Sequence, residues 1–161
     1  MMFRNANFDD LPHIHAIYQR AREYMRQTGN PNQWKDSKPR TELLDNDISL
    51  GQLYVLDDSG TLQAVFALIP GQDPTYGYIE GQWLNDAPYA TIHRIASAGL
   101  RKGILAECLA WCFSRYSNLR IDTHHDNAIM QHLLDKHGFT RCGIIYLEDG
   151  EPRIAYQKSA L

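Results

Sequence analysis

One strand–turn–helix pattern restricts the fold more than any other feature of this chain. Alternating apolar residues predict a strand over 91–97, a small-residue turn follows, and an apolar face at helical spacing predicts a helix over 101–116. Such a unit presents unpaired backbone N–H groups and a partial positive charge to an anion. Two cations and a glycine in the first predicted turn favour a phosphate or pyrophosphate there. These residues are Arg101, Lys102 and Gly103.

The remaining patterns predict a single-domain α/β protein with a mixed central sheet and helices on both sides. The segment 71–88 is rich in glycine, proline and aromatic residues, which predicts a long loop with a strand over part of 75–82. The other predicted strands are 3–6, 52–56, 62–69, 119–123, 140–147 and 153–157. The other predicted helices are 11–25, 40–48 and 127–137.

The composition indicates one globular domain over residues 1–161, with 43% hydrophobic and 22% charged residues. The formal net charge of −3 argues against a nucleic-acid partner, because such proteins usually present a basic face. The N-terminus lacks the apolar core of a signal peptide, and no apolar run approaches the ~20 residues that span a membrane. Cys108, Cys112 and Cys142 stand in apolar surroundings, which indicates buried thiols in a reducing compartment. We therefore expect a soluble cytoplasmic protein.

Four short motifs together resemble the GCN5-related N-acetyltransferase (GNAT) family. They are Arg94-Ile-Ala-Ser97, Arg101-Lys-Gly-Ile104, Asn127 at the start of a second helix, and Gly138-Phe139 at its end. The order of the predicted elements also resembles the family over most of the chain. The family's loop usually reads Gln or Arg, two residues, Gly, one residue, Gly or Ala. Here Leu100 and Leu105 occupy the first and last of these places.

The resemblance implies that the chain binds acetyl-CoA. In the family, the central strand hydrogen-bonds the pantetheine arm, one of its N–H groups faces the thioester oxygen, and the following turn holds the pyrophosphate. The matching residues are Ile95, Ala96 and Ser97 in the strand, and Arg101, Lys102, Gly103 and Ile104 in the turn. Asn127 is either a helix cap alone or also a contact for the cofactor arm.

The resemblance also implies an N-acetyltransferase, in which a primary amine of a small molecule or peptide attacks acetyl-CoA directly in a ternary complex. An amine of pKa ~10.4 is almost fully protonated at neutral pH, so a base or a desolvating pocket is needed. Many family members use a tyrosine to protonate the leaving thiolate, but Leu134 occupies the matching position here. A thiol of pKa roughly 8.5 can leave without that acid. Homodimers are common in the family, so a homodimer is a possible assembly.

Two residues are candidates for the catalytic base. Glu80 lies in the aromatic segment 71–88, where partial burial would make its carboxylate a better base; otherwise it is an exposed acid. Strand alternation places His93 on one face with Thr91 and Ile95, towards the thioester. Otherwise His93 is a core histidine bonded to the backbone.

Aromatic residues are candidates for the walls of the acceptor pocket. Tyr76 and Trp83 belong to the segment 71–88, and Trp34 closes a rigid turn after the first predicted helix. In related folds that turn borders the acceptor pocket. Each aromatic residue either contacts substrate or only closes its loop.

Two other functions remain open. One is a non-catalytic domain that binds CoA as a sensor or structural partner, which amine-stimulated hydrolysis of acetyl-CoA would exclude. The other is a metal-dependent hydrolase, because the segment 122–126 (Asp-Thr-His-His-Asp) contains metal-ligand residue types. That segment lacks a HExxH-like spacing, and helix capping explains the same residues, so we expect no metal. No P-loop and no Gly-x-Ser-x-Gly motif occurs.

Overall fold

The computed structural model describes residues 1–35 and 38–161. The strands in this part of the chain are β1 (Met2–Asn5), β2 (Leu53–Asp58), β3 (Thr61–Pro70), β4 (Glu80–Gly81), β5 (Ala90–Ser97), β6 (Asn118–Thr123), β7 (Thr140–Tyr146) and β8 (Pro152–Ser159). The α-helices are α1 (Leu11–Gln27), α2 (Thr41–Ser49), α3 (Ile104–Arg115) and α4 (Ala128–Lys136). Short 3-10 helices span Phe8–Asp10 and Pro74–Tyr76.

The strands form one eight-stranded sheet in the order β1-β2-β3-β5-β6-β8-β7-β4. β5 and β6 run parallel, and the other neighbouring pairs within the described residues are antiparallel. β8 lies between β6 and β7, so the last hairpin folds back into the sheet. The predicted mixed sheet is confirmed.

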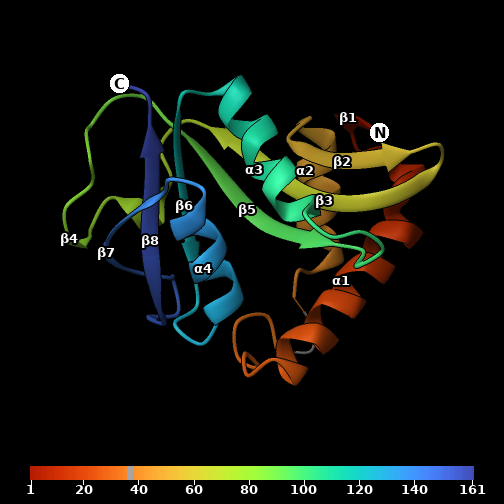
Figure 1. The fold of residues 1–161 in the computed structure, drawn as a ribbon, viewed down its shortest axis with the longest axis horizontal. Coiled ribbons are helices and arrows are strands. Elements are labelled where there is room, and N and C mark those ends of the chain that lie inside the picture. The colour runs from red at the N-terminus through yellow and green to blue at the C-terminus, as the bar shows by residue number, and fades with distance from the viewer. Residues whose placement is uncertain (36–37) are drawn as a thin grey trace.

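Helices cover both faces of this sheet (Figure 1). α3 and α4 pack on one face, in a core that includes Phe66, Leu109 and Leu134. α1 and α2 pack on the other face, in a core that includes Ile14 and Leu44. The predicted α/β arrangement with helices on both sides is therefore confirmed. Among the described residues, no helix is both long and apolar enough to cross a membrane.

α1 is positioned by clear signals at both ends. Asn7 and Asp10 form a capping box just before the helix, and each side chain accepts a hydrogen bond from the other's backbone N–H. The chain leaves the helix at Gly29, whose φ of 84° is left-handed. There the Asn30 N–H donates to the carbonyl of Met25 at 2.7 Å. This turn directs residues 30–35 towards the sheet.

The third helix begins later than the sequence predicts. α3 starts at Ile104, and Gly103 is its N-cap residue with a φ of 78°. A left-handed residue cannot belong to a right-handed helix, so Arg101, Lys102 and Gly103 form the turn before α3. The prediction that they form the first helical turn is wrong. The predicted order of strand, turn and helix is confirmed.

The segment 71–88 is mostly loop, and the strand predicted over 75–82 is reduced to two residues. Glu80 and Gly81 pair with β7 as β4. Gly81 has a φ of 134°, and a Cβ there would lie 2.2 Å from the carbonyl oxygen of Cys142. Glycine is therefore required for this close approach, which an extended regular strand would not make.

Candidate active site

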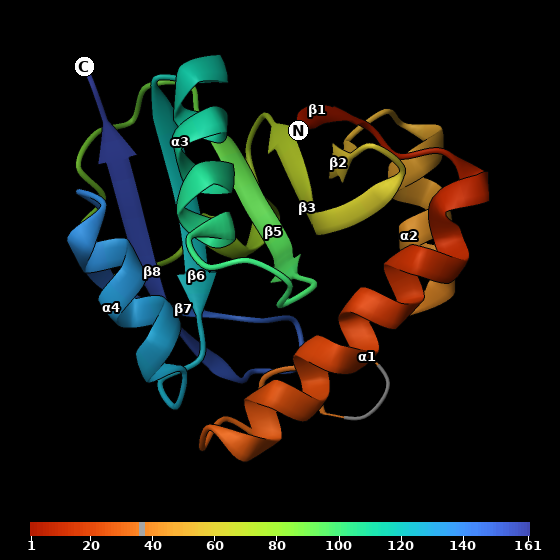
Figure 2. The ribbon, with the colours of Figure 1, turned by 45° about the vertical axis from the view of Figure 1, so that its right-hand side comes forward.

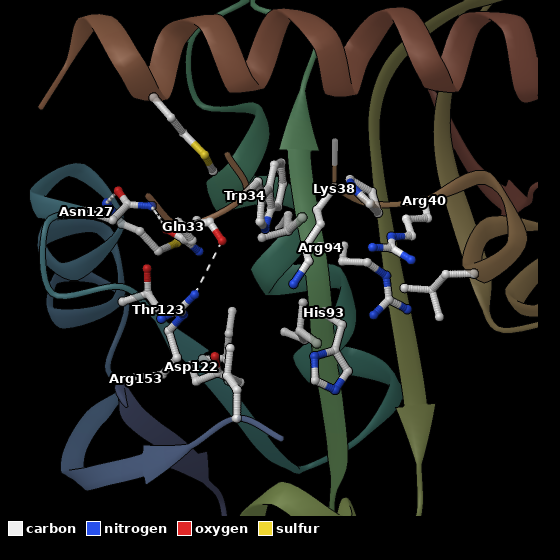
Figure 3. Close-up of a pocket in the computed structure, with 18 residues that line it drawn as sticks. Gln33, Trp34, Lys38, Arg40, His93, Arg94, Asp122, Thr123, Asn127 and Arg153 are labelled. Carbon is white, nitrogen blue, oxygen red and sulfur yellow. Dashed lines mark hydrogen bonds between the residues drawn. The ribbon is translucent and has the colours of Figure 1, made fainter. Parts of the chain in front are cut away.

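A cavity of about 340 Å³ lies beside the point where the two parallel strands separate. β5 and β6 pair only through Ala90–Leu119 and Thr91–Arg120 among the described residues. Beyond these pairs the strands diverge, and their arrowheads stand apart in Figure 2. Residues from β5, β6, α4, the α1–α2 connection and the β7–β8 hairpin line the cavity (Figure 3). Its volume suits a small molecule or the end of a peptide.

A β-bulge in β5 shapes one wall of this cavity. Between His93 and Ala96, β5 holds one residue more than the facing part of β3, and the register of the pair shifts there. Arg94 takes a left-handed conformation with a φ of 53°, which is uncommon for a residue with a side chain. The hydroxyl of buried Tyr18, on α1, donates to the carbonyl of Arg94 at 2.7 Å. α1 therefore holds the bulge in place.

The bulge changes which side chains share a face of β5. Ile92 and Ile95 both pack in the core beneath α3 and α4, although simple alternation would place them on opposite faces. The prediction that His93 shares a face with Ile95 is therefore wrong. His93 nevertheless lines the cavity, together with its neighbour Arg94.

His93 is paired with a carboxylate. Its Nε2 lies 2.8 Å from Oδ2 of Asp73, in the loop before β4, and both side chains are largely buried. Burial acts to raise the pKa of Asp73, but hydrogen bonds from His93 and Thr75 outweigh it and lower the pKa to about 2. Asp73 is therefore an anion at neutral pH, and we assign the proton of the neutral imidazole to Nε2. Nδ1 is then free to accept a proton.

The carboxylate of Asp122, which lines the cavity, is held by a tyrosine. The hydroxyl of Tyr76 donates to Oδ2 of Asp122 at 2.7 Å. Burial and the Asp122 charge raise the pKa of Tyr76 well above its usual value, so this hydroxyl stays protonated. Asp122 lines the cavity from β6, whereas Tyr76 lies behind it, and the rings of Tyr76 and His93 are 6.4 Å apart.

The loop after α1 closes another side of the cavity. The ring of Trp34 is buried against Tyr18, with ring centroids 5.5 Å apart. Oε1 of Gln33 accepts hydrogen bonds from Asn30 at 2.9 Å and from Asn127 at 3.0 Å. The Gln33 carbonyl also accepts from Arg153 at 3.3 Å, as Figure 3 shows. Gln33 thus connects this loop to α4 and β8.

A smaller pocket of about 80 Å³ adjoins the cavity along β5. Ile95, Ala96 and Ser97 line it together with residues of α1, α3 and α4. The guanidinium of Arg20, on α1, donates to the Ser97 carbonyl at 3.2 Å. It lies so close to Gly99 that a Cβ there would be only 2.2 Å away.

The turn before α3 continues this second region. Arg101 pairs with Asp58 at 2.6 Å on the surface, so one of the two predicted cations already has a partner. Gly103 has open space where a side chain would stand. The first N–H groups of α3 have no partner within the helix and are directed out of its N-terminus, which favours an anion there.

Comparison with known proteins identifies the family. No model of a protein family matches the sequence, and no curated protein matches it. Solved structures do match. A GNAT acetyltransferase from Streptococcus agalactiae 2603 superposes with a TM-score of 0.87 at 33% identity, covering 99% of this chain and 95% of that one. The chain belongs to the GNAT family of acetyltransferases.

Other GNAT-like structures share the fold at lower identity. A candidate acetyltransferase from Staphylococcus aureus Mu50 gives a TM-score of 0.74 at 22% identity, covering 99% of both chains. yncA, a candidate acetyltransferase from Salmonella typhimurium solved with its cofactor acetyl-CoA, gives 0.64 at 15% identity. It covers 98% of this chain and 92% of that one. The resemblance to the GNAT family expected from the four motifs is confirmed.

Within this GNAT fold, many of the predicted site residues lie together. His93, Ile95, Trp34 and Asn127 line the cavity, and Ala96 and Ser97 line the adjoining pocket. Asn127 caps α4, because its Oδ1 accepts the Met130 N–H at 3.0 Å, and it also faces both spaces. The remaining predicted cofactor residues form the turn and the start of α3 rather than a cavity wall. These are Arg101, Lys102, Gly103 and Ile104.

Glu80 does not join the others. It is exposed on β4 at the outer edge of the sheet, where the hydroxyl of Tyr146 donates to its Oε1 at 2.9 Å. The expected partial burial of Glu80 is therefore wrong, and Glu80 does not line the cavity.

Tyr76 and Trp83 are also misplaced by the sequence analysis. They pack in a third small core with Ile145, and neither lines the cavity. The Trp83 indole N–H donates to the Tyr76 carbonyl at 3.2 Å, and the guanidinium of Arg120 lies 4.0 Å from the Trp83 ring centroid. Both rings stabilise the loop that carries Asp73, because aromatic residues in a loop can build its own core.

Several residues at or near the cavity were not among the predicted site residues. They are Asp73, Arg20, Lys38 and Arg40, together with Asp122, which was considered only as part of the metal-ligand segment 122–126. Asp73 and Asp122 are 20 and 29 residues from His93 along the chain, and only the fold brings Asp73 to the His93 side chain and Asp122 to the cavity that His93 lines. One available signal was the Asp73-Pro74-Thr75 sequence, since an aspartate before such a turn often caps it.

The histidine-rich segment after β6 has a partly structural role. Ligand atoms of His124, His125 and Asp126 lie within 4.8 Å of one another. However, the Asp126 N–H donates to Nδ1 of His124 at 3.0 Å, which uses that nitrogen to shape the turn before α4. Burial lowers the pKa of His124, which keeps this nitrogen able to accept.

Proposed function

We propose that this GNAT-family chain is an N-acetyltransferase that moves the acetyl group of acetyl-CoA to a primary amine. The observation that carries this proposal is the His93–Asp73 pair, which is held in the wall of the opening between β5 and β6. An imidazole backed by an anionic carboxylate is a suitable base for an ammonium group that must lose its proton.

Acetyl-CoA would bind along the part of β5 that has left β6. Beyond Thr91, the edge of β5 that faces β6 has no strand partner among the described residues, so its backbone groups are available for the pantetheine arm. Oγ1 of Thr123, on β6, is buried and has no hydrogen-bond partner among the described residues. The turn of Arg101, Lys102 and Gly103 and the start of α3 are suited to the pyrophosphate. The complex of yncA with acetyl-CoA supports this use of the fold.

The reaction would follow from this placement. Nδ1 of His93 takes a proton from the bound ammonium, and the amine nitrogen attacks the thioester carbon. The carbon–sulfur bond then breaks, and the nitrogen releases its second proton to solvent to give the neutral amide. The new amide remains on the acceptor, and the sulfur leaves with the bonding electron pair. Asp73 stabilises the imidazolium that forms, because its carboxylate accepts from Nε2.

Among the described residues that line the cavity there is no tyrosine to protonate the leaving sulfur. Leu134 is fully buried in the core beneath α3 and α4 and cannot donate a proton. His132 and Tyr146, the possible substitutes in the sequence, are both exposed and do not line the cavity. A thiolate of pKa roughly 8.5 can take its proton from water, so the proposal requires no protein acid.

The test is amine-dependent release of free thiol from acetyl-CoA by the purified protein, with a mass spectrum of the acetylated amine. We expect thiol and acetylated product in equal amounts. Binding of acetyl-CoA without any turnover would instead support the non-catalytic CoA-binding alternative. Thiol release that needs zinc but no amine would support the hydrolase.

A further inference from the structure

We infer that the acetyl acceptor is a small molecule whose primary amine lies a few bonds from an anionic group, either a carboxylate or a phosphonate. The inference rests on the proposed N-acetyltransferase function and names the class of its acceptor. It comes from the charged side chains that line the cavity. These are mostly cations, although the whole chain has a formal net charge of −3.

Cations outnumber carboxylates in the lining of the cavity. Four permanently cationic side chains line it, and Asp122 is the one carboxylate in the lining among the described residues. The cations are Lys38, Arg40, Arg94 and Arg153. An acceptor carrying only positive charge would face mainly like charges in this lining.

Two of the four cations already form ion pairs with carboxylates of the protein. Arg94 pairs with Asp47, which is 1% exposed and also accepts from Gln52 at 2.8 Å. Arg153 pairs with Glu151 at 3.3 Å. These pairs hold their guanidinium groups in fixed positions, and their charge is largely balanced within the protein.

Lys38 and Arg40 have no ion-pair partner within residues 1–35 and 38–161. Both are exposed at the cavity and belong to the α1–α2 connection. The Lys38 backbone is held by two hydrogen bonds, from its N–H to the Trp34 carbonyl at 3.3 Å and from Arg22 to its own carbonyl at 3.1 Å. Asp149 is close enough to interact with the Lys38 charge, but it lies outside the lining. Two cations with no ion-pair partner among the described residues are suited to an anion.

The positions of these charges match a molecule with both an amine and an acid. Figure 3 shows Lys38, Arg40 and Arg94 on one side of the cavity, and Asp122 and Thr123 on the other, with Arg153 beside them. His93 precedes Arg94 in β5, so an amine that faces His93 has its acid group within reach of the cations. The buried Nε of Arg94 has no hydrogen-bond partner among the described residues and is a further donor at this end.

The phosphates of acetyl-CoA do not account for these cations. Neither Lys38 nor Arg40 lines the smaller pocket along Ile95–Ser97, and the turn residues 99–103 do not line the larger cavity. The phosphate-binding candidates are thus a separate set. They are Arg101, Lys102 and Arg20.

The test compares matched amines that differ only in the acid group. Each L-amino acid is compared with its α-carboxamide. The other acids, β-alanine, γ-aminobutyrate and aminoethylphosphonate, are compared with the neutral amine ethanolamine. Acetyl transfer is followed by thiol release and binding by calorimetry. For wild-type protein we expect at least roughly tenfold higher kcat/KM for the acid than for its neutral counterpart, about 1.4 kcal/mol.

Variants then locate the preference. In Lys38→Met/Arg40→Met the preference for the acid should fall about tenfold or more while the KM for acetyl-CoA is unchanged. Lys136→Met, which removes an exposed cation of α4 outside both pockets, should leave the preference intact. A preference that survives in the double variant would overturn the inference, as would equal or better use of the neutral amines.

Binding separates this inference from the proposed function. If no amine is acetylated but an acid binds, its amide does not, and the double variant loses binding, the acceptor class stands and the N-acetyltransferase proposal fails. If neutral amines are acetylated with a kcat/KM equal to that of the amines that carry an acid, the proposed function stands and the inference fails. The absence of saturable binding by every acid in the panel would also overturn the inference.

Discussion

The two regions that meet at the opening of the sheet are built differently. In the larger cavity, side chains from separate segments are fixed by partly or fully buried pairs, His93–Asp73 and Arg94–Asp47. Along the carboxyl end of β5 and the turn before α3, consecutive residues offer mainly backbone groups, and the ion pair Arg101–Asp58 is on the surface. The first region depends on the whole fold, whereas the second depends on one contiguous motif. Substitutions should therefore affect the two regions in different ways.

The largest effect should come from the proposed base. We expect His93→Ala to lower kcat by about 10²–10⁴, because the acceptor would lose the group that takes its proton. Binding of acetyl-CoA should be unchanged, since we propose that the second region holds most of that substrate. The measurement is amine-dependent thiol release at saturating acetyl-CoA.

Glu80→Gln is the matched control for His93→Ala. Glu80 is exposed at the sheet edge and hydrogen-bonded to Tyr146, so its rates should equal those of the wild type at every pH. A large loss in Glu80→Gln with none in His93→Ala would reverse the assignment of the base.

The next effect separates a buried ion pair from a surface one. Arg94→Met leaves the Asp47 carboxylate buried without its cation, and we expect it to lower the free energy of unfolding by about 3–5 kcal/mol. Arg101→Met removes the exposed pair with Asp58 and should cost less than about 1 kcal/mol. Chemical denaturation measures both. Adding Asp47→Asn to Arg94→Met should recover stability, and equal losses in the two single variants would contradict the comparison.

A smaller effect than the loss of the Arg94–Asp47 pair concerns the dependence of stability on Asp73 in acid. The pKa of Asp73 is lowered from 3.8 to about 2 in the folded chain, so its ionised form stabilises the fold above pH ~4 and this contribution is lost as the pH falls through 2. The shift corresponds to about 2 kcal/mol. We expect Asp73→Asn to be less stable than wild type at pH 7, with the difference shrinking between pH 4 and 2. A constant difference over that range, measured by denaturation at each pH, would remove this role.

Local patterns predicted most of the fold, because the strands and helices follow apolar periodicity and clear turn residues. Gly103 shows the limit of this reasoning. Its position close to the start of a helix was predictable. Its left-handed conformation was not, because the sequence does not state φ values, and this conformation moves the start of α3 to Ile104. The reduction of β4 to two residues likewise follows from a contact between Gly81 and Cys142, which are far apart in the sequence.

The candidate site was predictable only in part. Residues on the contiguous motif, such as Ile95 and Ser97, could be placed because their neighbours in sequence are also their neighbours in space. His93 was found as a candidate, but its partner Asp73 was not, because a bulge and a loop bring the two together. Glu80 illustrates the opposite error, since aromatic neighbours in sequence did not bury it.

The most direct test of the central claim, that the opening beside β5 binds acetyl-CoA, is a calorimetric titration of wild-type protein and Gly103→Glu with this substrate. A Cβ at Gly103 would have no other atom within 4 Å, so the variant should fold, with a cost of about 1–2 kcal/mol for the left-handed conformation. The account predicts saturable binding near one molecule per chain in the wild type and none in the variant, whose carboxylate would repel the pyrophosphate. Equal binding by both proteins, or no binding by the wild type, would contradict it.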